Sequence, residues 1–89
     1  MIEEAPGTYT VTVDDRTRTT HTVRVPPWLP DRLGCGQVPV VELVRCSFVF
    51  LLAREPATSI LGSFSLEQIG DYFPDYPDAI GPLVAAGPG

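Results

Sequence analysis

The most apolar stretch of the chain is 38–53, where twelve of sixteen residues are apolar. Interpreted as a helix, it begins with Pro39 in the first turn and ends before Pro56. Six of its β-branched or aromatic residues favour a strand instead: Val40, Val41, Val44, Phe48, Val49 and Phe50. The length favours the helix, because about sixteen residues exceeds the usual length of a strand, and the strand stays as the alternative.

On a helical wheel this stretch carries one stripe that changes character halfway along. Glu42 and Arg45 are three residues apart and lie close together in its first half. Val49 and Ala53 continue the same stripe without any polar group. Either the domain wraps around this helix or another copy of the protein covers it, so we expect Glu42, Arg45, Val49 and Ala53 at a partner interface.

The N-terminal part predicts a β-hairpin. Apolar and polar residues alternate strictly over 8–13, and residues 17–25 repeat the pattern after a turn at 14–16. The residues on the apolar face of each segment have odd residue numbers. Opposed residues of an antiparallel pair point to the same face of the sheet. The connecting loop must therefore contain an odd number of residues, three or five, for both strands to face one core.

The clearest local signal is a helix start at Ser65. Ser65 and Gln68 have the spacing of a capping box, while Phe64 and Ile69 have that of a hydrophobic staple. The predicted helix runs to about Phe73, where Pro74 stops it. Beyond it we expect a turn or a single helical turn, then a frayed tail over 81–89.

Three aromatic residues near this helix allow two interpretations. Tyr72, Phe73 and Tyr76 form either a docking patch for a partner or a lid on the core.

In the connector at 25–37, three prolines stop regular structure, and we expect Trp28 to be buried at one end of the core. The predicted fold is α+β: one domain over 1–80, with the hairpin packed on the long apolar helix and a short capped helix after it.

Composition and charge narrow the function classes. The 89 residues carry a net charge of −5, of which 55–89 holds all five units, whereas 16–32 is basic. All basic residues other than His21 are Arg, which indicates a GC-rich, bacterial source. The acidic start lacks a secretory signal, and no charge-free run approaches the roughly 20 residues of a membrane span. We therefore expect a cytoplasmic protein with no membrane contact and with reduced cysteines.

Candidate chemistry is sparse. His21 lies on the apolar face of the second strand and is interpreted as structural, since it has no partner in a catalytic motif. Cys35 lies between two glycines that would leave its thiol exposed, and Arg24 or Arg32 would lower its pKa, so a reactive thiol is an alternative. Cys46 is interpreted as a buried apolar residue. The residues show no metal-site spacing, and no cofactor is expected.

Two function classes remain. We expect a non-catalytic protein–protein interaction module, either a homodimer or the small subunit of a bacterial complex. The alternative is a small regulator that contacts nucleic acid through Arg18 and Arg24, which share the threonine-rich face of the hairpin. The net negative charge and the absence of basic residues near the capped helix weigh against that alternative.

Overall fold

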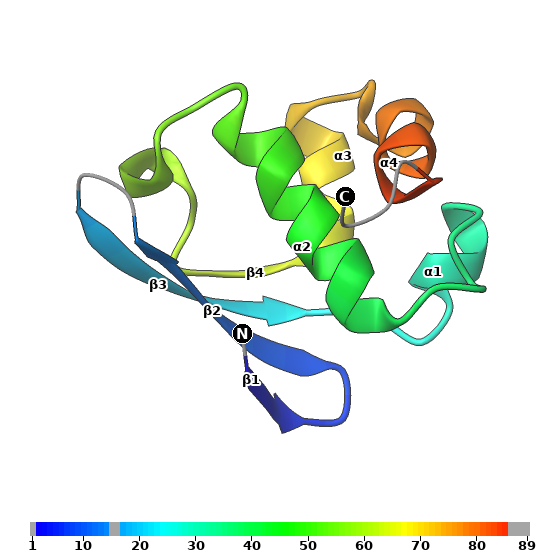
Figure 1. Cartoon of the computed structure of the whole chain (residues 1–89), viewed down its shortest axis with the longest axis horizontal. Helices are drawn as coiled ribbons and strands as arrows, with labels where there is room; N and C mark the ends of the chain where they lie inside the picture. Colours follow the sequence, from blue (N-terminus) through cyan, green and yellow to red (C-terminus); the bar gives the residue numbers. More distant parts are fainter. Residues whose placement is uncertain (1, 15–16, 86–89) are drawn as a thin grey trace.

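A computed structural model describes residues 2–14 and 17–85, which form an α+β fold with one sheet and one layer of helices (Figure 1). Within this part of the chain the sheet has four strands in the order β1-β2-β3-β4. The strands are β1 (Ile2–Ala5), β2 (Thr8–Asp14), β3 (Arg18–Arg24) and β4 (Ser63–Ser65). The helices are α1 (Leu29–Arg32), α2 (Val40–Leu52), α3 (Ile69–Tyr72) and α4 (Tyr76–Ala85), with single 3-10 turns η1 (Ala57–Ser59) and η2 (Leu66–Gln68).

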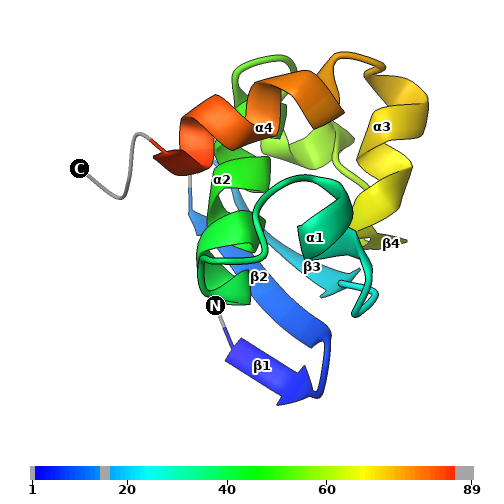
Figure 2. The ribbon, with the colours of Figure 1, turned by 90° about the vertical axis from the view of Figure 1, so that its right-hand side faces the viewer.

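The predicted hairpin and its parity are confirmed. β2 and β3 are antiparallel, with Tyr9 opposite Val23 and Val11 opposite His21. Asp14 pairs with Arg18, so the connection has three residues, an odd number as expected. These four opposed side chains are buried beneath the helices, which all lie on one side of the sheet (Figure 2). The even-numbered threonines of both strands consequently lie on the uncovered face, whereas Thr19, opposite Val13, shares the covered face.

Two strands were not predicted from the sequence. β1 is antiparallel to β2, and all four of its residues are exposed, so it has no apolar alternation to reveal it. Gly7, at φ +78°, makes the turn between them. β4 pairs with β3 in parallel, and α2 lies in the crossover between them. The three residues of β4 are too few to show the alternation of a strand, and its partner strand β3 is about forty residues away in the chain.

The central stretch is a helix, as its length predicted, and α2 begins at Val40, directly after Pro39 at its N-cap. Its core side includes Leu43, Val44 and Phe48, each at most 4% exposed. Just beyond its end, Arg54 donates a hydrogen bond to the Phe50 carbonyl at 3.4 Å, where a cation favourably opposes the helix dipole. No helix in 2–14 or 17–85 has both the length and the apolar character to cross a membrane.

The capped helix is also confirmed. Gln68 Oε1 accepts a hydrogen bond from the Ser65 backbone N–H at 2.7 Å, which is the reciprocal half of a capping box. The Ser65 hydroxyl donates to Glu67 Oε1 at 3.1 Å. The helical residues run through η2 and α3 to Tyr72, one residue short of the expected end at Phe73.

The C-terminal segment is more ordered than expected. α4 continues through Ala85 despite Gly81 and Pro82, so the predicted tail does not begin at residue 81. Leu83 and Val84 are partly buried and pack against the core, which explains why the helix persists there. The remaining tail residues, 86–89, lie outside the described residues.

The expectation for Trp28 is wrong. Its side chain is 48% exposed, and the neighbouring Leu29 is buried in its place at 3% exposure. The Arg32 guanidinium lies 5.2 Å from the centre of the Trp28 ring, within cation–π distance. The first turn of α1 therefore contributes a leucine, not the tryptophan, to the core.

Candidate functional site

The outward face of α2 exposes apolar side chains along the length of the helix. Val41, Val49 and Leu52 are 44%, 46% and 38% exposed, and Ala53, which follows the helix, is exposed as well. From Val41 to Leu52 the helix rises by about 16 Å. We call Val41, Arg45, Val49, Leu52 and Ala53 the α2 stripe. The structure thus places the predicted residues Val49 and Ala53 on an open surface.

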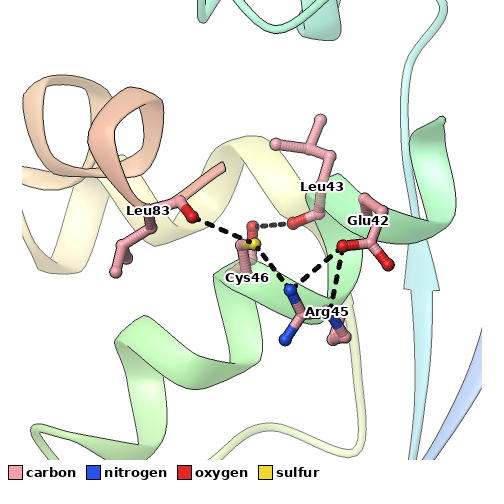
Figure 3. A network of polar contacts seen from close by, with 6 residues as sticks. Glu42, Leu43, Arg45, Cys46 and Leu83 are labelled. Atoms are coloured by element: carbon pink, nitrogen blue, oxygen red, sulfur yellow. Dashed lines mark hydrogen bonds and ion pairs between the residues drawn. The ribbon is translucent and has the colours of Figure 1, made fainter. Parts of the chain in front are cut away.

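The polar half of this face carries an ion pair. Arg45 donates hydrogen bonds from Nε and Nη2 to Glu42 Oε2, at 3.1 and 3.0 Å (Figure 3). This hydrogen bonding is the main reason that the pKa of Arg45 is raised. Both side chains are about one-third exposed, at 39% and 32%. The predicted neighbours Glu42 and Arg45 therefore neutralise each other on the partly exposed surface of the helix.

Cys46 connects this face to α4. Its Sγ accepts a contact from Arg45 Nη2 at 3.6 Å and donates to the Leu83 carbonyl at 3.8 Å (Figure 3). The side chain is 3% exposed, as expected for a small buried residue. Cys46 thus links the inner side of the ion pair on α2 to α4.

The predicted aromatic patch divides into three environments. Tyr72 is 65% exposed, and Phe73 is partly buried with its ring edge-on to Phe50 at a centroid distance of 5.8 Å. Tyr76 is only 1% exposed, so its assignment to a partner surface is wrong. The ring can be buried because its hydroxyl forms a hydrogen bond with the buried side chain of Ser47. Tyr72 and Phe73 remain candidates for contact with a partner.

Tyr72 and Phe73 line an open apolar cavity of about 330 Å³. Its apolar walls come from the end of α2, from η1 and the residues after it, from β4 and from α3, and Glu55 and Gln68 are its long polar residues. We call this space the apolar cavity. Its lining consists of Leu51, Glu55, Ser59, Ile60, Leu61, Phe64, Gln68, Ile69, Tyr72 and Phe73.

A second, larger groove of about 740 Å³ is lined by charged residues of both signs. Arg24, Trp28 and Arg32 contribute to its lining, as do Glu67 and Asp71. The groove includes one of the two arginines expected to contact nucleic acid, while the other lies elsewhere.

Arg18 and Arg24 occupy opposite ends of β3. They are six positions apart, which corresponds to about 20 Å along the strand. Arg18 lies 3.4 Å from Asp14, and both side chains are about 70% exposed. The uncovered sheet face between them presents threonines. The structure does not gather these two arginines into one basic patch.

Cys35 is buried, contrary to the exposure expected from its flanking glycines. It is 3% exposed, and its Sγ donates to the Leu33 carbonyl at 3.5 Å. Burial, followed by the nearby Cys46 sulfur, raises the pKa of the Cys35 thiol. A raised pKa lowers the thiolate fraction at neutral pH, so the basis for predicting a reactive thiol is wrong.

His21 makes contacts within the core. Its ring Nδ1 donates to the Leu61 carbonyl at 2.8 Å, and Nε2 accepts from the Thr19 hydroxyl at 2.9 Å. Its ring packs against Phe48 at a centroid distance of 5.4 Å. Among residues 2–14 and 17–85, no three His, Cys, Asp or Glu side chains are grouped as metal ligands.

The apolar cavity was not anticipated from the sequence. Its lining residues extend over 51–73 and show no common period, because they come from a helix end, a 3-10 turn, a short strand and a second helix. Comparisons with protein-family models, curated proteins and solved structures found no match.

Proposed function

We propose that this protein is a non-catalytic protein–protein interaction module that forms a homodimer through the α2 stripe. The observation that supports this proposal is the exposure of Val41, Val49 and Leu52 on one face of the longest helix. A second surface that covers an apolar helix face of this kind lowers the free energy of the system, because it removes apolar groups from water.

The size of the domain favours a second copy as the partner, and the α2 stripe offers a surface without unpaired charge for it. The chain carries a net charge of −5, which repels another copy at long range. The α2 stripe adds no unpaired charge to this repulsion, since its arginine is paired with Glu42 and its other members are apolar. Domains of this size also bury a small share of their surface, so an additional interface contributes substantially to stability.

The experiment compares two charge substitutions by light scattering. Val49→Asp places a carboxylate in the α2 stripe, and we expect it to reduce the mass of the particle to that of one chain. Thr20→Asp adds the same charge at an exposed site on the sheet face, so it should leave the dimer intact. Equal masses for both variants would contradict an interface at α2. Far-UV circular dichroism controls for loss of fold.

A further inference from the structure

The apolar cavity has a buried apolar wall and an exposed apolar rim. Ile60, Phe64 and Ile69 are each at most 8% exposed, whereas Leu61 and Tyr72 at its border are 47% and 65% exposed. A space of about 330 Å³ lies at the lower end of the range for ligand pockets. It is large enough to take one or two bulky apolar side chains.

One carboxylate, that of Glu55, lines the apolar cavity, and the part of the chain that follows Arg54 is acidic. Residues 55–89 contain five carboxylates and no Arg, Lys or His: Glu55, Glu67, Asp71, Asp75 and Asp78. Within 2–14 and 17–85, Asp75 pairs with Arg54 at 2.6 Å, and none of the ion pairs involves Glu55. Glu55 itself lines the cavity and is partly buried. An apolar group that enters here meets the carboxyl group of Glu55, which forms no ion pair within the described residues.

We propose that the apolar cavity binds a basic amphipathic segment of a partner protein. A large apolar side chain of that segment fills the cavity, and a neighbouring Lys or Arg pairs with Glu55. Charge complementarity selects this occupant, because an acidic segment would be repelled by the same surface. The inference extends the proposed interaction role to a class of partner, and it uses a surface separate from the residues of the α2 stripe.

The test uses two labelled peptides and fluorescence anisotropy. One peptide carries Leu at helical i, i+3, i+4 spacing with Lys elsewhere, and the other replaces every Lys by Glu. We expect the Leu/Lys peptide to bind and the Leu/Glu peptide not to bind. Leu61→Ser should weaken binding by about tenfold, because it removes an apolar group at the rim. Leu52→Ser, an exposed leucine of the α2 stripe, is the matched control and should leave peptide binding unchanged.

A second pair of variants distinguishes a specific contact with the Glu55 carboxylate from general electrostatic attraction to the acidic protein. Glu55→Gln should weaken binding of the Leu/Lys peptide by about two- to fivefold. Asp78→Asn removes the same charge at an exposed site outside the cavity lining, and its effect should be smaller. Equal effects of these two variants would overturn the inference. Equal binding of both peptides, or no binding of either, would overturn it as well.

Light scattering in the absence of peptide distinguishes this inference from the proposed dimer. Leu61→Ser should keep the dimer while it loses peptide binding, and Val49→Asp should lose the dimer while it keeps peptide binding. If Leu61→Ser alone produced monomers, the cavity would be occupied by a second copy. That result would overturn the assignment to a basic partner.

Discussion

The Tyr76 hydroxyl donates a hydrogen bond to Ser47 Oγ at 2.7 Å in the interior of the protein. Ser47 in turn donates to the Leu43 carbonyl at 2.7 Å, which determines the direction of the first bond. Both side chains are at most 1% exposed. This relay joins α4 to the centre of α2, so the C-terminal helix is part of the folded domain that supports the α2 stripe.

The hydrogen bond between Tyr76 and Ser47 should couple the effects of replacing these two residues. Ser47→Ala leaves the Tyr76 hydroxyl buried without an acceptor, and we expect unfolding free energy to fall by about 1–3 kcal/mol. Tyr76→Phe should cost about 1 kcal/mol. The double variant should cost less than the sum of the two single variants, since no buried hydroxyl remains without a partner. Urea denaturation of all four proteins measures this coupling, and strict additivity would contradict it.

The same tyrosine should make the protein sensitive to high pH. Burial raises the pKa of Tyr76 from 10.0 to about 12. The folded state therefore holds its proton more tightly than the unfolded state, so this contribution to stability is complete below about pH 10 and is lost as the pH rises to about 12. The loss amounts to about 2–3 kcal/mol.

Urea denaturation at several pH values in this window tests the effect. The slope of stability against pH should be shallower in Tyr76→Phe than in the unsubstituted chain. Equal slopes would show that Tyr76 does not carry the dependence. Tyrosinate absorbance gives a second readout, because the most resistant of the three tyrosines should titrate near the upper end of the window.

The turn between β1 and β2 requires glycine at position 7. Gly7 has φ +78°, and a Cβ there would lie 3.0 Å from the Val25 carbonyl oxygen. We expect Gly7→Ala to lower the unfolding free energy by about 1–2 kcal/mol. Gly62→Ala is the matched control, because its φ is ordinary and a Cβ meets nothing within 4 Å. Thermal unfolding compares the two variants, and equal midpoints would contradict the required conformation.

Both cysteines should resist modification in the native protein. Cys35 and Cys46 are each 3% exposed, and the pKa of Cys35 is raised by burial. A thiol reagent at neutral pH should therefore label the protein slowly, and denaturant should accelerate labelling at both positions. Rapid labelling of Cys35 without denaturant would contradict this description and would favour a thiol-dependent activity.

Local patterns predicted much of the fold. The alternation around Val11 and Val23 gave the correct parity of the hairpin, because strand side chains repeat with a period of two. The length of the apolar stretch identified α2, and the spacing of Ser65 and Gln68 identified the capped helix. On α2, the helical wheel correctly indicated that Val49 faces outward.

The remaining features depend on contacts between distant parts of the chain. β4 is a strand because it joins β3 across a crossover, and α4 persists past Pro82 because Leu83 and Val84 contact the core. Burial of Cys35 and exposure of Trp28 depend on how the connector folds back on the helices. The apolar cavity has the same origin, since its walls meet only in the folded structure.

Light scattering of the unsubstituted chain over a concentration series, in reducing buffer at physiological salt, tests the central claim most directly. We predict a particle with twice the mass of one chain, because the α2 stripe loses contact with water only when a second copy covers it. A monodisperse monomer at high micromolar concentration would contradict a homodimer formed through α2.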